Sequence, residues 1–394
     1  MAVTFAQRLY FDYNASAPLG EAARAAMVET LDLDGNASSV HGEGRQLRRR
    51  IEAVRQVLAD HAGVAPKQVI FTSGASEAAA QMLSPMFRQA KGELAVSSLI
   101  VSAIEHPCVL SGGRFAPGSV RTLPVGADGV ADLAALESLL AGLDGAAGVP
   151  LVALMLANNE TGIVQPVAAA GEIVHRHGGL LLVDAVQGLG RLEIAPAMLG
   201  ADFIMLSAHK AGGPKGVGAI VLGNAALAPM QLLRGGGQEN FHRAGTENAA
   251  AIAGFGAAIT ALPPRAKWQE ISRLRDLLEA GLRSISIANG IAAPVIFGEK
   301  SQRLANTTCH AVAGIRAETA LISLDLAGIA GSSGSACSSG KVKKSHVLAA
   351  MGVDTDLAAC ALRISLGPDS THADVTRYLA AWKDIVARMA KRAA

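Results

Sequence analysis

Residues 180–216 constrain the fold of this chain more strongly than any other stretch. They contain two short runs, LLLVD at 180–184 and DFIML at 202–206, and each run leads into a polar residue or a glycine-rich turn. Short runs that are apolar throughout are typical of strands buried on both faces of a parallel sheet. Because the carboxyl ends of parallel strands meet at one edge, we expect Asp184 and Lys210 to face the same crevice.

An aspartate and a lysine in one crevice favour the chemistry of pyridoxal phosphate (PLP). A lysine surrounded by apolar strand ends is easily desolvated, which frees its amine for Schiff-base formation. An aspartate is the partner that the protonated pyridine nitrogen of PLP requires. The alternative is a structural aspartate and a surface lysine that happen to follow strands, since polar residues are common at strand ends.

Strands and helical segments alternate through much of the chain. Besides the two runs above, strands are predicted at 69–72, 99–104, 151–156 and 220–222, with helical segments between them. This alternation predicts an α/β fold with a doubly wound, mainly parallel sheet that is covered by helices on both faces. A chain of 394 residues is also long enough for more than one domain.

Polar residues follow several of these strands. They are Ser76, His106, Asn159, Asp184, Gln187 and Lys210. One such residue alone is most simply a structural residue, but a shared position at the carboxyl edge of the sheet favours a single pocket. The turn at 73–77 offers N–H groups that suit a phosphate, although an ordinary capped helix explains this turn equally well.

A second, smaller α+β domain is predicted after Pro263 and Pro264, which indicate a boundary. A helix is expected at 268–287. Apolar residues recur with helical spacing from 375 to 389, which predicts a final amphipathic helix.

Two features of this second domain favour chemistry. Residues 331–340, GSSGSACSSG, are too rich in glycine and serine to pack, so we expect Cys337 to be an exposed and mobile nucleophile. The alternative is a linker with an incidental cysteine. Arg363 is the one charge in the strand-like run at 362–366, and a guanidinium between apolar residues suits a substrate carboxylate.

Charge, hydropathy and cysteine spacing exclude other classes of protein. The net charge is only +2, so we expect neither nucleic acid nor a membrane surface as a partner. The longest apolar run is too short to span a bilayer and the N-terminus lacks an export signal, which predicts a soluble, cytoplasmic protein. The four cysteines lack metal-ligand spacing, so we expect no metal site, no disulfide and a packing role for Cys108.

The chain closely resembles the cysteine desulfurases of the NifS and IscS type, within the class V aminotransferase group of PLP enzymes. The likeness runs from YFDYNASAP to RISLG and rests on FTSGASE, EHPCVL, NNETG, VDAVQ, SAHKAGGPKGVGA, RAGTEN and SSGSACSSG, in the order and spacing of the family. It implies a PLP-dependent transferase of fold type I. The large, mainly parallel sheet domain would span 17–260, and residues 1–16 and 261–394 would form the small domain with the cysteine loop.

The resemblance also implies a role for each matched residue. Lys210 would form the Schiff base with PLP, Asp184 would pair with its nitrogen, and His106 would stack on the ring and take part in proton transfer. Cys337 would accept sulfur. The remaining cofactor contacts would come from Asn159 and Gln187, with the phosphate held by Ala75, Ser76, Ser207, His209 and, from the other subunit of a homodimer, Thr246. Asn36 and Arg363 would hold the substrate carboxylate.

The implied activity is conversion of L-cysteine to L-alanine, with the sulfur passed to Cys337 as a persulfide. An acceptor protein of unknown identity would then use it in iron–sulfur cluster or thio-cofactor biosynthesis. Two alternatives remain open: a selenocysteine lyase or other class V PLP aminotransferase, and a non-catalytic binding protein. Ala37 stands where the family usually has proline, and the lysines at 341–344 form either a partner-docking patch or a solvated basic face.

Overall fold

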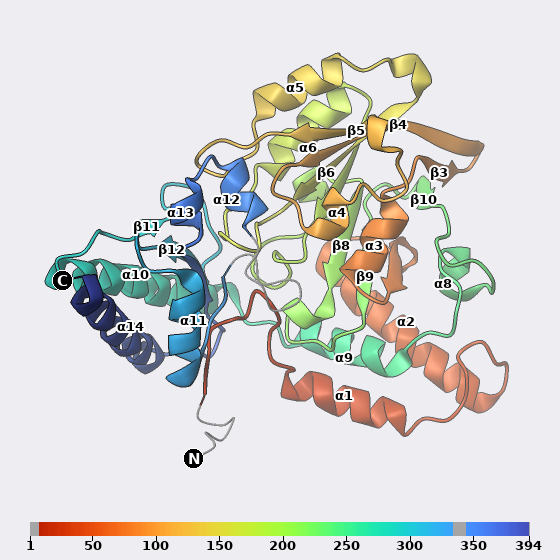
Figure 1. Ribbon diagram of the computed structural model, residues 1–394. Helices are drawn as coiled ribbons and strands as arrows, with labels where there is room; N and C mark the ends of the chain where they lie inside the picture. Colours follow the sequence, from red (N-terminus) through yellow and green to blue (C-terminus); the bar gives the residue numbers. More distant parts are fainter. Residues whose placement is uncertain (1–7, 334–343, 394) are drawn as a thin grey trace.

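The computed structural model describes residues 8–333 and 344–393, and its largest element is a nine-stranded sheet (Figure 1). The order of the strands is β10-β3-β4-β6-β7-β8-β9-β2, with β5 paired to β4. The strands are β2 (Val69–Thr72), β3 (Met86–Gln89), β4 (Gly92–Ser102), β5 (Val120–Leu123), β6 (Val149–Met155), β7 (Leu180–Asp184), β8 (Phe203–Ser207), β9 (Gly218–Leu222) and β10 (Leu227–Pro229).

Most strands of this sheet run in one direction. Strands β4, β5, β6, β7 and β8 pair in parallel, and β9 lies antiparallel between β8 and β2, so that β2 again points the same way as β8. Strand β3 is antiparallel to β4 at the other end. The predicted α/β fold with a mainly parallel sheet is therefore confirmed. The carboxyl ends of β2, β6, β7 and β8 lie at one edge.

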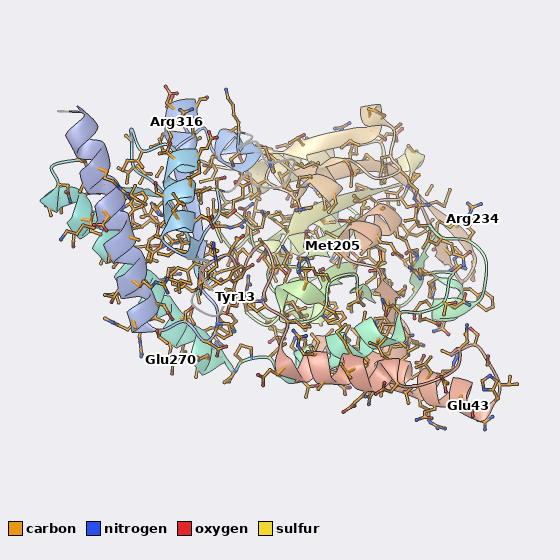
Figure 2. The ribbon with its side chains drawn as sticks, turned by 60° about the horizontal axis from the view of Figure 1, so that its bottom comes forward. Tyr13, Glu43, Met205, Arg234, Glu270 and Arg316 are labelled. Carbon is orange, nitrogen blue, oxygen red and sulfur yellow. The ribbon has the colours of Figure 1, made fainter. Side chains whose placement is uncertain are left out.

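Each central strand is buried on both faces. Along β8, Ile204 and Leu206 belong to the core shared with α2 (Gly42–Ala62), α5 (Leu133–Ala141), α6 (Val167–Arg176) and α9 (Ala249–Thr260). Phe203 and Met205 belong to the core shared with α3 (Ala75–Met82) and α4 (Pro107–Leu110). Figure 2 shows Met205 in the middle of the sheet. Burial on both sides explains why these strands are apolar throughout rather than alternating.

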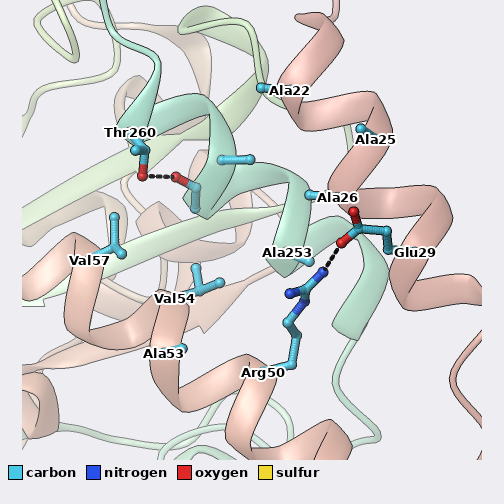
Figure 3. Close-up of a pocket in the computed structure, with 12 residues that line it drawn as sticks. Ala22, Ala25, Ala26, Glu29, Arg50, Ala53, Val54, Val57, Ala253 and Thr260 are labelled. Atoms are coloured by element: carbon cyan, nitrogen blue, oxygen red, sulfur yellow. Dashed lines mark hydrogen bonds and ion pairs between the residues drawn. The ribbon is translucent and has the colours of Figure 1, made fainter.

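A groove of about 310 Å³ lies between α1 (Glu21–Leu31), α2 and α9 (Figure 3). Its walls are mostly alanine and valine, which allow α1 and α9 to approach closely. The guanidinium of Arg50 donates to Glu29 at 2.6 Å, and the hydroxyl of Thr260 donates to the carbonyl of Gly256 at 3.1 Å. These partners satisfy the polar groups at the groove, so we regard it as a packing feature.

A smaller body packs beside the large sheet and contains two further sheets. One is the antiparallel sheet β11 (Val295–Ile296), β12 (Thr307–Ala311) and β14 (Ala361–Ser365), and the other pairs β1 (Leu9–Tyr10) with β13 (Ile329–Ala330). Helices α10 (Arg265–Ala288), α11 (Ala317–Leu326) and α14 (His372–Ala393) cover them. Trp382, Tyr378 and Phe11 fill this core. The domain boundaries at 17–260 and 261–394 stay a prediction.

Short helices complete the described part of the chain. They are α7 (Pro196–Leu199), α8 (Gln238–Phe241), α12 (His346–Ala350), α13 (Thr355–Ala358) and the 3-10 turns at Pro66–Gln68, Pro117–Ser119, Gly145–Ala147 and Ala208–Lys210. Within residues 8–333 and 344–393, no helix is long and apolar enough to cross a membrane.

The N-terminal segment, residues 9–17, runs from the smaller body to the large sheet. The amide of Phe11 donates to the carbonyl of Ala330 at 2.8 Å, and the amide of Asn14 donates to the hydroxyl of Ser365 at 3.0 Å. The amide of Ala17 then donates to the carbonyl of His209, beyond β8, at 2.9 Å. Tyr13 accordingly lies between the two bodies in Figure 2. The segment bonds to both bodies, and its regular strand is limited to β1.

A substitution at Gly218 would test the packing at the edge of the sheet where the strands end. Gly218 pairs with Thr72 on one side and Ser207 on the other, and a Cβ atom there would lie 2.5 Å from the carbonyl oxygen of Leu206 and 2.8 Å from the backbone of Gly74. We expect Gly218→Ala to lower the free energy of unfolding in urea by about 1–3 kcal/mol, the usual range for overpacking. Gly42→Ala is the control, because nothing lies within 4 Å of a Cβ at Gly42. Equal stability of the two variants would contradict this packing.

Candidate active site

A cavity of about 550 Å³ opens at the carboxyl ends of β2, β6, β7 and β8. Its walls come from the N-terminal segment, the turn before α3, the start of α4, the turns after β6, β7 and β8, and strand β14. Most of the site residues expected from the sequence line it: Ala75, Ser76, His106, Asn159, Asp184, Gln187, Ser207, His209, Lys210 and Arg363. The strand-end argument thus brings together the side chains that it predicted would meet.

Two expected residues that the structure describes, Thr246 and Asn36, do not line this cavity in the single chain. Thr246 lines a separate cavity of about 210 Å³ beside Arg243. Asn36 lies in the loop between α1 and α2, where its side-chain oxygen accepts a hydrogen bond from the amide of Ser38 at 2.8 Å. Cys337, like the lysines at 341 and 343, lies outside the described residues. The roles of these residues stay predictions.

Lys210 closes the 3-10 turn that follows β8. Its ammonium donates to the carbonyl of Asn14 at 2.7 Å and to that of Ala15 at 2.8 Å. Both acceptors belong to the N-terminal segment, so this segment fixes the direction of the lysine side chain.

Asp184 is the last residue of β7 and only 8% of its surface is exposed. Its carboxylate accepts a hydrogen bond from the amide of Val186 at 2.9 Å. Burial raises the pKa of Asp184 from 3.8 to about 6, although the Val186 amide and the charge of Lys210 act in the opposite direction. Gln187, on the next turn, donates to the carbonyl of Asn14 at 2.9 Å. A buried anion is thereby held at the base of the cavity.

His106 caps the N-terminus of α4. Its Nδ1 lies 3.3 Å from the amide nitrogen of Cys108 and 3.0 Å from the Cys108 sulfur. Burial lowers the pKa of His106, and the charges of Lys210 and His346 lower it further. Cys108 packs against the core beside α3 and α4, as expected, and it also lines the cavity. The short turn of α4 brings it onto the histidine.

The turn before α3 forms one end of the cavity. Its N-cap is Gly74, which has no side chain to cap the helix, so the first N–H groups of α3, including those of Ala75 and Ser76, are available to an anion. His209 and Lys215 line the same cavity. Burial lowers the pKa of His209 to about 4, and the charges of Lys210 and Lys215 add to this effect. These groups suit a phosphate bound among neutral donors and a cation.

Arg363 lies in β14 and is 4% exposed. Its guanidinium donates to the carboxylate of Asp12 at 2.6 Å and to the carbonyl of Asn159 at 3.0 Å. Its Nε is buried and has no hydrogen-bond partner among residues 8–333 and 344–393. A substrate carboxylate at this arginine would therefore bind beside Asp12 and would share the guanidinium with it.

Sequence reasoning missed several residues of the wall. They are Asp12, Asn14, Ser16, Cys108, Lys215 and Ser332. The turn at 14–18 and the serines at 332–333 were visible as polar segments, but only the strand ends gave a reason to place residues in one crevice. Glu105 was also missed. It is fully buried next to His106, accepts the amide of Met155 at 2.6 Å, and has a pKa raised well above its usual value by burial and by Asp184.

The residues fit PLP. The cavity has the amine of Lys210 for an aldehyde, a buried carboxylate for the pyridine nitrogen, and helix N–H groups with Lys215 for the phosphate. Together with the mainly parallel sheet, this arrangement defines a PLP-dependent enzyme of fold type I.

The chain belongs to the class-V aminotransferase family, whose model matches residues 9–378. A cysteine desulfurase of Cereibacter sphaeroides is 37% identical over 387 residues, which is 96% of each chain. The solved NifS-like protein of Rickettsia africae matches with a TM-score of 0.83 and 30% identity, over 96% of this chain and 99% of that one. SspA, solved in complex with cysteine, matches with a TM-score of 0.74 and 27% identity, over 92% and 100%. PLP is the cofactor of this family.

The raised pKa of Asp184 predicts a pH-dependent stability of the protein freed of PLP. Between pH 3.8 and about 6 the folded protein binds more protons at this residue than the unfolded chain does, so stability falls as the pH rises through this window. We expect Asp184→Asn to remove up to about 3 kcal/mol of this loss, since one pKa unit corresponds to about 1.4 kcal/mol. Urea unfolding from pH 4 to pH 7 measures the effect.

Some of the pH dependence will remain in Asp184→Asn, because Glu105 shifts in the same direction. The exposed Asp34 provides the matched control, and Asp34→Asn is expected to leave the slope unchanged. Identical pH profiles of the wild type and Asp184→Asn would contradict the burial of this carboxylate.

Proposed function

We propose that this protein is a cysteine desulfurase that converts L-cysteine to L-alanine and passes the sulfur to Cys337 as a persulfide. The observation that carries the proposal is the meeting of Lys210, Asp184 and His106 in one cavity of a chain that is 37% identical, over almost its full length, to a curated cysteine desulfurase. SspA, a structural relative, was solved with cysteine, which supports cysteine as the substrate.

The proposed contacts with PLP follow from the cavity wall. Asp184 would hold the pyridine nitrogen, and Asn159 and Gln187 would contact the cofactor from the turns after β6 and β7. The phosphate would bind Ala75, Ser76, Ser207 and His209 at the turn before α3, with Thr246 added from a second subunit. When bound, PLP supplies the electron sink that labilises the bonds at the substrate's α-carbon.

The side chains of the cavity would bind the substrate and transfer its proton. At neutral pH, Asp184 is ionised because its pKa is about 6, and a pyridinium beside it would lower that pKa further. The amine of Lys210 would take the proton from the substrate's α-carbon once its hydrogen bonds to Asn14 and Ala15 open. Arg363, with Asn36, would hold the substrate carboxylate. His106 would stack on the ring.

The described residues on either side of 334–343 support a role for Cys337 at this cavity. Ser332 lines the cavity and pairs with Arg363 through backbone hydrogen bonds of 2.6 and 3.1 Å. On the other side, Ser345 donates to the buried carboxylate of Glu160 at 2.5 Å, and His346 contacts the carbonyl of Glu105 at 2.9 Å. Both ends of the segment that carries the cysteine are therefore attached at or beside the active site.

We propose further that the enzyme acts as a homodimer in the cytoplasm. Thr246 is exposed on the single chain, as a residue that serves a neighbouring subunit would be. Cys108, Cys309 and Cys360 are free thiols, which suits a reducing compartment. The persulfide would be delivered to an acceptor protein for iron–sulfur cluster or thio-cofactor biosynthesis.

Cys337→Ala tests the activity most sharply. We expect sulfide release from L-cysteine to fall by about a hundredfold or more, because the nucleophile that takes the sulfur is lost, while the visible absorbance of bound PLP persists. The assay measures sulfide and alanine from the purified enzyme with a thiol reductant. Cys360→Ala is the matched control, since Cys360 is buried and contacts the carbonyl of Asp356 outside the cavity.

Sulfur release from Cys337→Ala at the wild-type rate would refute the proposed function. If the variant keeps cleavage of selenocysteine but not of cysteine, the enzyme is a selenocysteine lyase. A purified protein without PLP and without turnover of either amino acid would be a non-catalytic member of the family.

A further inference from the structure

Cys108 contacts His106 through two of its own groups. Its amide nitrogen lies 3.3 Å from Nδ1 of His106, in the N-cap geometry of α4, and its sulfur lies 3.0 Å from the same nitrogen. Both residues line the cofactor cavity. The imidazole edge that carries Nδ1 is therefore used within α4, and Nε2 is the ring nitrogen that remains for the cavity.

These contacts decide which nitrogen carries the proton. A backbone amide can only donate, so Nδ1 must accept and must be unprotonated while the N-cap hydrogen bond exists. The S–H of Cys108 can also donate to this unprotonated Nδ1. The neutral imidazole then has its proton on Nε2. Protonation at Nδ1 would break the N-cap hydrogen bond, because the Nδ1–H and the amide N–H of Cys108 would both be donors.

The charged and titratable groups around the pair favour the same state. Lys210, after β8, and His346, on α12, both oppose a positive charge on His106. Asp184, at the end of β7, and Glu105, just after β4, both oppose a negative charge on the Cys108 sulfur. Burial has the largest effect on the Cys108 thiol, whose pKa is raised to about 12. Burial and these four groups thus oppose a thiolate–imidazolium pair, the reactive form of many Cys–His pairs.

We propose that Cys108 is a positioning residue that holds the neutral His106 as the Nε2–H tautomer, so that the ring presents an N–H donor to the cofactor cavity. The tautomer itself does not depend on the proposed function. Only its consequence for the reaction rests on that function. The role in proton transfer that the family resemblance implies for His106 stays a prediction.

The test reads the tautomer directly. In the PLP-loaded enzyme labelled with ¹⁵N-histidine, long-range ¹H–¹⁵N correlation spectra distinguish a protonated from an unprotonated ring nitrogen, and the His106 signals are those lost in His106→Gln. We expect Nε2 protonated and Nδ1 unprotonated at pH 7. In Cys108→Ala, we expect the titration midpoint of His106 to rise by roughly half to one pH unit, the effect of losing one neutral hydrogen bond.

Two further variants make the result specific to the thiol. Cys108→Ser keeps a donor at this position and should restore a midpoint close to that of the wild type. Cys360→Ala removes a buried thiol outside the cavity and should change nothing. A proton on Nδ1 at pH 7, or an unchanged midpoint in Cys108→Ala, would overturn the proposal. The spectra do not depend on turnover, so failure of the desulfurase assignment would leave this test intact.

Discussion

The buried side chain of Asn14 is the point at which the parts of this molecule meet. Its amide donates to the hydroxyl of Thr307 in β12 at 2.9 Å, and its side-chain oxygen accepts from Arg191, after β7, at 3.0 Å. Its carbonyl accepts from both Gln187 and Lys210. The residue is 1% exposed, so its own polar groups depend on these partners and not on water. Such a network is stable only when every member is satisfied.

This dependence explains why the N-terminal segment matters to the active site. The segment bonds to β13 and β14 on one side and to the turn after β8 on the other, and it supplies the acceptors that orient Lys210. The smaller body contributes more to the active site than Arg363 and the segment that contains Cys337. Through Asn14 it helps to determine the direction of the lysine on the large sheet.

Electrostatics give the cavity its chemical character. Asp184, at the end of β7, and Glu105, just after β4, are buried carboxyl groups, while Lys210, Lys215 and Arg363 are basic groups of the wall. Burial raises the pKa of both acids. Bound PLP would bring a cation to Asp184 and an anion to the start of α3, which are the charges that each end lacks. Complementarity of this kind is a physical reason for the fit of the cofactor.

The sequence predicted the sheet, its covering helices and the strand-end residues, because buried parallel strands are apolar throughout and their carboxyl ends share one edge. Other features depend on contacts that no local pattern specifies. The pairing of Arg363 with Asp12 joins residues 351 positions apart, and the position of Cys108 on His106 depends on the single turn of α4. Thr246 and Asn36 lie away from the cavity of the single chain, so strand-end reasoning could not reach them.

The attachment of PLP to Lys210 is the central claim, and Lys215 lines the same cavity as a natural competitor. Borohydride reduction of the purified enzyme fixes PLP on the lysine that holds it, and peptide mass spectrometry identifies that lysine. We predict the phosphopyridoxyl group on Lys210 and an unmodified Lys215. The group on Lys215, on another lysine or on no peptide at all would contradict the account.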